Sequence, residues 1–234
     1  MGMGETAENI AENYDLSREQ QDGFAVESQR KAVEAQRLGR LKKEIIPIET
    51  KSGKINEDGC IRADTTNETL GSLKPAFSET GSVTAGTSSP LTDGASAVLV
   101  TTEEFAEKNG LEPLARIKSF AVSGCKPEIM GIGPVVSSKK AMKRAGITAD
   151  DLDVIELNEA FSSQSLAAIQ DLELDIAKIN VDGGALALGH PLGATGARIT
   201  GKAAQILRRD GGRYALSTQC IGGDQGIATV LEAA

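Results

Sequence analysis

The chain has 234 residues, enough for one large domain or two small ones with a buried core. Asp and Glu number 33 against 25 Lys and Arg, and the formal net charge of −8 argues against nucleic-acid binding and against docking on anionic membranes. The sequence contains no long apolar run and no secretory leader, so we expect neither a membrane span nor secretion.

The first ninety or so residues are polar and irregular. Ser17 is the expected N-cap of a long helix that runs to Leu38, and an Ile-rich strand is expected at Glu44–Glu49. A polar turn follows at 53–59, and a capping box at Thr65–Glu68 opens another helix. The Ser, Thr and Gly content of 81–90 is typical of a loop.

From about residue 93 the pattern becomes a regular alternation of strands and helices, which predicts a layered α/β domain around a mostly buried sheet. A buried strand is expected at 94–101, with a helix after it that ends near Gly110. Later strands are expected at 115–122, 153–157, 213–219 and 226–232, and later helices at 137–145, 161–172 and 193–209.

The sequence has one histidine, His190, within the glycine-rich segment 183–198. It precedes a predicted helix, and the N-terminus of a helix favours an oxyanion or enolate nearby. The alternative is a structural histidine that caps a turn. Glycine on both sides favours the catalytic interpretation, because it lets a substrate approach the main chain.

Two further groups stand at predicted strand ends. Cys220 precedes Gly222, whose N–H could donate to an oxyanion, although a buried cysteine acting as a small apolar side chain is common. Asn158 could hold a water molecule or, equally, cap the following helix.

The three cysteines, Cys60, Cys125 and Cys220, are far apart, and one histidine cannot complete the usual zinc spacings. We therefore expect free thiols in a reducing compartment and no metal. The expected location is the cytoplasm or, in a eukaryote, the peroxisome or mitochondrion.

Nearly the whole chain resembles the 3-ketoacyl-CoA thiolases. The segments that carry the resemblance occur in thiolase order and include the three catalytic-looking motifs: 3–9, 16–22, 73–77, 84–86, 129–134, 158–161, 183–198 and 220–226. The resemblance implies acyl transfer to and from coenzyme A, by thiolysis or Claisen condensation. CoA and acyl-CoA would be substrates, with no permanently bound cofactor.

By this resemblance, His190 activates the nucleophile and forms an oxyanion hole with a water held by Asn158. Cys220 acts as general base and acid, and the Gly222 N–H contributes to a second oxyanion hole. Arg62 and Ser89 fall where CoA contacts are expected. The thioester pocket would be lined by Met3, Phe77 and Met130.

The resemblance also implies a division of the chain. Residues 1–91 match a mixed α+β loop domain that covers CoA, 92–112 the last strand and helix of an N-terminal domain, and 113–234 the thiolase C-terminal domain. A thiolase nucleophile lies upstream of the loop domain, and neither Cys60 nor Cys125 has its sequence context. We therefore expect a truncated enzyme that is inactive alone, whose partner is the missing N-terminal domain or another copy.

Two other functions stay open. The chain could be a non-catalytic subunit that binds CoA or a partner. It could also be a cysteine–histidine hydrolase in which Cys220 is itself the nucleophile.

Overall fold

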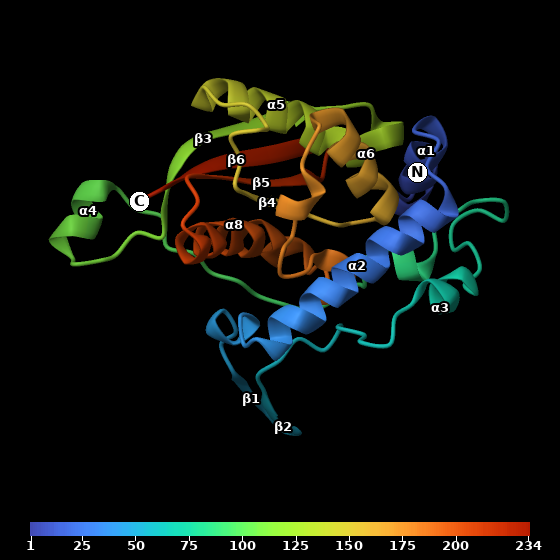
Figure 1. Cartoon of the computed structure of the whole chain (residues 1–234), viewed down its shortest axis with the longest axis horizontal. Helices are drawn as coiled ribbons and strands as arrows, with labels where there is room; N and C mark the ends of the chain where they lie inside the picture. The colour runs from blue at the N-terminus through green and yellow to red at the C-terminus, as the bar shows by residue number, and fades with distance from the viewer.

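The computed structural model describes residues 1–234 and is organised around a four-stranded sheet of strand order β3-β6-β5-β4 (Figure 1). The strands are β3 (Ala115–Gly124), β4 (Val154–Leu157), β5 (Tyr214–Ile221) and β6 (Gln225–Ala233). Only β4 and β5 run parallel, and Leu157 pairs with Thr218. Their carboxyl ends therefore meet at one edge of the sheet.

Helices cover both faces of this sheet. Helices α5 (Gly133–Ala145) and α6 (Ser162–Leu172) pack on one face through the larger apolar core, which includes Ile155, Leu157 and Leu216. Helix α8 (Leu192–Asp210) covers the other face through a smaller core around Val154, Ala215 and Leu207 (Figure 1). The predicted layered α/β architecture is confirmed, because the apolar residues of the strands alternate between two helical layers.

The first ninety residues form a mixed region that packs against α6 and the short helix α7 (Ala185–Leu188). It contains α1 (Met3–Asn13), α2 (Arg18–Arg37), α3 (Asn67–Gly71) and the hairpin of β1 (Ile48–Thr50) and β2 (Gly53–Ile55). Ser17 caps α2 as predicted, since its hydroxyl accepts from the Gln20 N–H. None of the helices combines the length and apolar character needed to cross a bilayer.

The strand expected at Glu44–Glu49 is shorter and later than predicted. Glu44 ends a short 3-10 helix (Leu41–Lys43), and pairing begins only at Ile48. The displacement has two causes: Pro47 has no N–H to donate to a sheet, and the carboxylate of Glu44 is bound by Lys202 at 2.5 Å.

The prediction of a buried strand at 94–101 is wrong. The segment is extended but pairs with no strand, and the exposed fractions of Leu99 and Val100 are 74% and 67%. It runs beside α8, where the Ser96 hydroxyl donates to the Ala194 carbonyl at 2.6 Å. The expected helix does form, as α4 (Glu103–Lys108), and it projects away from the sheet (Figure 1). The backbone of 94–101 stays unpaired because no strand within residues 1–234 lies beside it.

Asp182 joins the N-terminal region to α8. Its fully buried carboxylate accepts ion pairs from Lys202 at 2.8 Å, Arg209 at 2.6 Å and Arg40 at 3.0 Å. Burial alone would raise the pKa of this carboxyl, but the three cations outweigh burial and hold the pKa below its usual value. Asp182 is therefore ionised in the folded protein over the whole neutral range.

Asp182→Asn is expected to lower the free energy of unfolding by about 3–5 kcal/mol at neutral pH, because it leaves buried cations without their counter-ion. A carboxyl whose pKa is depressed by folding stabilises the fold above its unfolded value, about 3.9, and loses that contribution as the pH falls through the lower folded value. The difference between Asp182→Asn and wild type should therefore shrink as the pH falls below about 4.

Urea unfolding at a series of pH values measures this difference. Glu34→Gln is a matched control, since it removes an exposed ion pair with Arg37 on α2 and should leave the unfolding midpoint nearly unchanged. An equal loss of stability at neutral and acidic pH would contradict the assignment of the effect to the charge of Asp182.

Candidate active site

His190 lies in the turn between α7 and α8, next to the carboxyl ends of β4 and β5. The turn requires Gly189, whose φ of +91° is open to glycine and strained for other residues. The backbone N–H of His190 donates to the Pro90 carbonyl at 3.4 Å, which ties the turn to the end of the N-terminal region. A cavity of about 390 Å³ opens beside the imidazole and is lined by Leu91, Thr92, Asp93 and Leu192.

The imidazole is held at both nitrogens. Its Nδ1 lies 2.6 Å from the Thr195 hydroxyl and its Nε2 lies 3.4 Å from the Asn158 side-chain nitrogen. Thr195 donates its own hydroxyl hydrogen to the Pro191 carbonyl at 3.1 Å, so it accepts from Nδ1–H. This network assigns the hydrogen to Nδ1 and leaves the Nε2 lone pair facing Asn158, available to accept a proton.

The environment favours the neutral imidazole. Burial, and then the positive charge of Arg198 on α8, lower the pKa of His190 below its ordinary value of 6.5. At neutral pH the ring is therefore uncharged and able to act as a base.

Asn158 follows β4 directly and is rigidly placed. Its N–H donates to the Thr218 carbonyl at 3.0 Å, and its own carbonyl accepts from Gln164 at 3.3 Å. The side chain is buried, with Oδ1 lacking any partner within the chain. An unpaired buried amide oxygen is costly unless water or a ligand satisfies it, so this atom is a site for either.

Cys220 lies near the end of β5, opposite Gly226 on β6. Burial raises the pKa of the Cys220 thiol to about 11, and the nearby Cys125 thiol raises it further. The carboxylate of Asp224 raises the pKa of Cys125 but is not among the causes of the shift at Cys220. Gly222 lies beyond β5 in the exposed turn to β6.

Neither of the other cysteines forms a hydrogen bond with the imidazole. The Cys125 thiol is directed at two carbonyls, those of Asp224 at 3.4 Å and Met130 at 3.5 Å. Cys60 is half-buried in the loop between β2 and α3. No group of three or more His, Cys, Asp or Glu side chains converges in a way that could hold a metal ion.

Two of the three residues expected to line a thioester pocket lie at junctions with the N-terminal helix α1. The Phe77 ring covers the backbone of Gly4, next to Met3, and meets Phe161 edge-on with ring centroids 6.0 Å apart. Met130 is buried in the 3-10 helix Pro127–Ile132, which packs on α1. Met3 and Phe77 are about half exposed, so this apolar surface is open to solvent.

Ser89 and Arg62, the two residues expected to contact CoA, lie in different surroundings. Ser89 lies beside the Asn158 turn, since its N–H donates to the Ala160 carbonyl at 3.0 Å. Arg62 is exposed, and its backbone N–H is held by the Gln29 side chain at 2.8 Å. The guanidinium of Arg62 forms no ion pair within the chain and is free to meet an anion.

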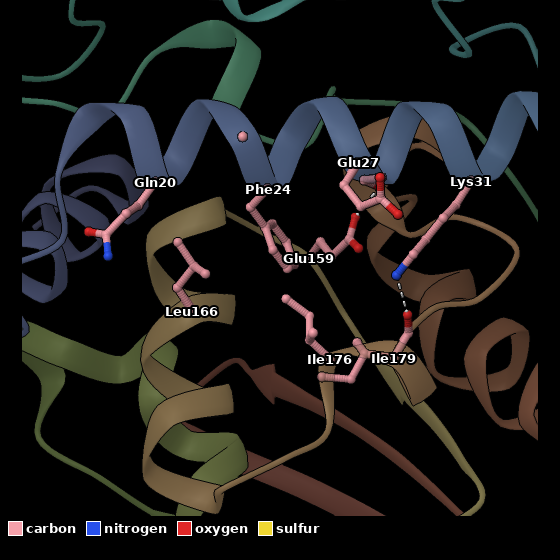
Figure 2. Close-up of a pocket in the computed structure, with 10 residues that line it drawn as sticks. Gln20, Phe24, Glu27, Lys31, Glu159, Leu166, Ile176 and Ile179 are labelled. Carbon is pink, nitrogen blue, oxygen red and sulfur yellow. Dashed lines mark hydrogen bonds between the residues drawn. The ribbon is translucent and has the colours of Figure 1, made fainter.

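A second cavity, of about 230 Å³, lies between α2 and α6 (Figure 2). Glu159 lines it, and this carboxylate accepts from Ser28 at 2.6 Å, Asn180 at 2.7 Å and the Leu186 N–H at 3.1 Å. Its oxygens are thus engaged by three structural donors. Phe24 and Leu166 add apolar walls, and Lys31 is bound to the Ile179 carbonyl (Figure 2). No free acid or base faces this cavity, and His190 does not line it.

Comparisons with known proteins identify the family of the chain. The family model for the thiolase N-terminal domain matches residues 1–104, and the model for the thiolase C-terminal domain matches residues 111–233. The chain belongs to the thiolase family.

Its relatives include a 3-ketoacyl-CoA thiolase of Marinobacter nauticus, 53% identical over 98% of this chain and 61% of that protein. The mitochondrial 3-ketoacyl-CoA thiolase of Homo sapiens is 48% identical over 98% of this chain and 59% of its own length. The crystal structure of the human enzyme in complex with CoA superposes with a TM-score of 0.97, at 46% identity, over 100% of this chain and 59% of that one. The chain therefore spans about 60% of the length of its curated thiolase relatives.

Three residues of this candidate site were missed by sequence reasoning. Thr195 binds the imidazole from the first turn of α8, Arg198 lowers the pKa of the imidazole, and Glu156 lies two residues before Asn158 on the same face of β4. Thr195 and Arg198 are three residues apart on a predicted helix. This spacing could have predicted from the sequence that they share one face of the helix.

Thr195→Val is expected to remove the acceptor for Nδ1–H and to shift the His190 tautomer toward Nε2–H. Because the chain has a single histidine, the ¹⁵N chemical shifts of Nδ1 and Nε2 report this change without ambiguity. Thr200→Val is the matched control, since Thr200 contacts Ser217 and not the ring. Unchanged ¹⁵N shifts in Thr195→Val would refute the assigned hydrogen-bond network.

Proposed function

We propose that residues 1–234 form the proton-handling part of a 3-ketoacyl-CoA thiolase, an acyltransferase that works with CoA by thiolysis or Claisen condensation. The observation that carries this proposal is the His190–Asn158 arrangement: a neutral imidazole, anchored through Nδ1–H, presents Nε2 beside a buried amide. The names of the relatives favour a role in fatty-acid β-oxidation. The corresponding locations are the cytoplasm or, in a eukaryote, the mitochondrion or peroxisome.

In the direction of cleavage, the His190 Nε2 takes the proton of a cysteine nucleophile, which attacks the 3-keto carbon. The carbon–carbon bond breaks, the acyl group stays on that cysteine, and the acetyl-CoA enolate takes a proton from Cys220. Since burial raises the pKa of Cys220 to about 11, this thiol carries its proton at neutral pH and suits the role of donor. The resulting Cys220 thiolate then deprotonates incoming CoA, whose sulfur attacks the acyl group. The nucleophilic cysteine leaves as a thiolate and takes its proton back from the His190 Nε2, which restores both groups.

The nucleophile in this scheme comes from residues outside 1–234. Cys125 is directed at two carbonyls, and Cys60 belongs to the loop that precedes α3. The exposed segment 94–101 supports docking of a further domain, because its backbone is unpaired and Val98, Leu99 and Val100 face solvent. We propose the N-terminal part of a thiolase as the partner, on the same or a separate polypeptide, with a second copy of this chain as the other possibility.

The purified 234-residue chain is expected to show no thiolysis of acetoacetyl-CoA above background. Turnover should be restored by adding a second polypeptide. This polypeptide is the segment of the Marinobacter nauticus thiolase that lies N-terminal to the region aligned with this chain. Absorbance of the enolate of acetoacetyl-CoA at alkaline pH measures both results. Turnover by the chain alone would contradict the proposal that the nucleophile lies outside it.

In the complemented enzyme, Cys220→Ser should lower turnover by about a hundredfold or more, because the proton donor is lost. Cys60→Ser is the matched control and should leave turnover unchanged. Equal loss in both variants would show that the effect is structural.

A non-catalytic subunit that binds CoA is the second candidate, favoured by the unpaired Arg62 guanidinium. Calorimetry with CoA tests it on the chain alone: heat at millimolar CoA that Arg62→Gln reduces supports binding, and the absence of heat opposes it. A hydrolase with Cys220 as nucleophile is disfavoured, since a thiol of pKa about 11 is ionised in roughly one molecule in ten thousand at pH 7.

A further inference from the structure

The helix α7, which leads into His190, cannot hold its own position. It is a single turn of four residues, Ala185–Leu188, and one hydrogen-bonded turn is not stable by itself. Its position is therefore set by contacts with other parts of the chain. The closest comes from α2: a Cβ on Gly183, two residues before α7, would lie 2.5 Å from that of Ala32. Position 183 has no room for a side chain, so α2 packs directly on the backbone there.

The backbone of Leu186, within α7, is bound at both of its polar groups. Its N–H donates to Glu159 Oε2 at 3.1 Å, and Glu159 directly follows Asn158. Its carbonyl accepts from the side-chain nitrogen of Gln29 on α2 at 3.1 Å. Glu159 itself lies beside α2 (Figure 2), where Ser28 donates to the same carboxylate oxygen at 2.6 Å. Leu186 therefore links α2 with the strand end that carries Asn158.

The amide of Gln29 also binds a second part of the chain. Its Oε1 accepts from the backbone N–H of Arg62 at 2.8 Å, in the loop between β2 and α3. Gln29 is only 8% exposed, and both ends of its amide are engaged. A flipped amide would set its oxygen against the Leu186 carbonyl and its nitrogen against the Arg62 N–H, so a single orientation is allowed. Gln29 therefore bridges Arg62 and Leu186 in one fixed geometry.

A second glutamine on α2 shows what is particular to Gln29. Gln36 lies seven residues later, which is about two helical turns, so the two glutamines lie on the same side of α2. The Gln36 side-chain nitrogen donates to the Glu57 carboxylate, in the same loop as Arg62, at 3.1 Å. This bond is exposed, and Gln36 forms no hydrogen bond with α7. Of the two glutamines, Gln29 alone connects the loop with the helix that leads into His190.

We propose that Gln29 is a positioning residue for the reaction: it fixes the loop that carries Arg62 to the turn that carries His190. Arg62 is exposed and can bind an anionic group. Under the proposed function this anion belongs to CoA, whose sulfur reacts near His190. A fixed spacing lets one CoA molecule meet both ends without the entropic cost of ordering the loop. The relevance to CoA rests on the proposed function, whereas the bridge itself is a property of the 234-residue chain.

The bridge is tested in the tag-free 234-residue chain without any ligand. Gln29→Met keeps the length of the side chain and removes both hydrogen bonds, and Gln29→Asn keeps the amide but is one methylene too short to reach both partners. Both variants should shift the His190 ring signals in ¹H–¹³C NMR, which the single histidine makes unambiguous. Exchange of the His190 amide should become about fivefold faster, the factor expected for the loss of one hydrogen bond. Amides of β5 and β6 should exchange as in wild type.

The complemented enzyme supplies a second readout. Gln29→Met should raise the KM for CoA roughly fivefold, because the loop is no longer held at the required distance, and should also lower kcat. A general loss of folded protein would lower kcat and leave the KM for CoA unchanged, so that result would overturn the positioning role.

Gln36→Met is the matched control, since it removes a contact with the same loop and none with α7. Its His190 signals and amide exchange should match those of wild type, and an effect equal to that of Gln29→Met would overturn the proposal. The proposal also fails if both Gln29 variants leave His190 unchanged, or if they accelerate exchange equally throughout the chain. Failure of the complementation assay, with the local changes present in the isolated chain, would count against the proposed function alone.

Discussion

The carboxylate of Glu159 is the contact on which the site depends. It is fully buried and accepts from three parts of the chain that are distant in sequence: Ser28 on α2, Asn180 before α7, and the N–H of Leu186 within α7. Burial raises the pKa of this carboxyl, while the three donors oppose that rise. Since Glu159 follows Asn158 directly, and α7 leads into His190, one side chain sets the spacing between the two groups proposed to be catalytic.

This arrangement indicates that the N-terminal region supports a site whose proposed catalytic residues all come from the C-terminal half. Ser28 reaches Glu159 from α2, and on the same helix Gln29 donates to the Leu186 carbonyl at 3.1 Å. Just after α7, the His190 N–H donates to the Pro90 carbonyl. The turn that holds the imidazole is therefore fixed from both sides by residues of the first ninety, and loosening that region would displace the base without touching it.

Local features of the chain were predictable and long-range ones were not. Ser17 as the cap of α2, and Gly146 at the end of α5 with a φ of +72°, follow from short-range backbone chemistry. The segment 94–101 has the composition of a buried strand, but burial needs partner strands, which composition does not specify. His190, Cys220 and Asn158 could be singled out from their local sequence context, but the catalytic roles proposed for them came only from resemblance to a family. Their mutual geometry depends on the parallel register of β4 and β5 and on the first turn of α8, which single residues do not encode.

The two side chains proposed as proton carriers, His190 and Cys220, favour opposite proton occupancies, and burial produces both. Burial disfavours charge, so it lowers the pKa of a base such as His190 and raises that of an acid such as Cys220. At neutral pH the imidazole is ready to accept a proton and the thiol is ready to give one. The proposed carbon–carbon bond cleavage needs a proton acceptor at the nucleophile and a proton donor at the departing enolate. Burial alone is therefore sufficient to prepare two side chains for complementary proposed roles, without an ion pair between them.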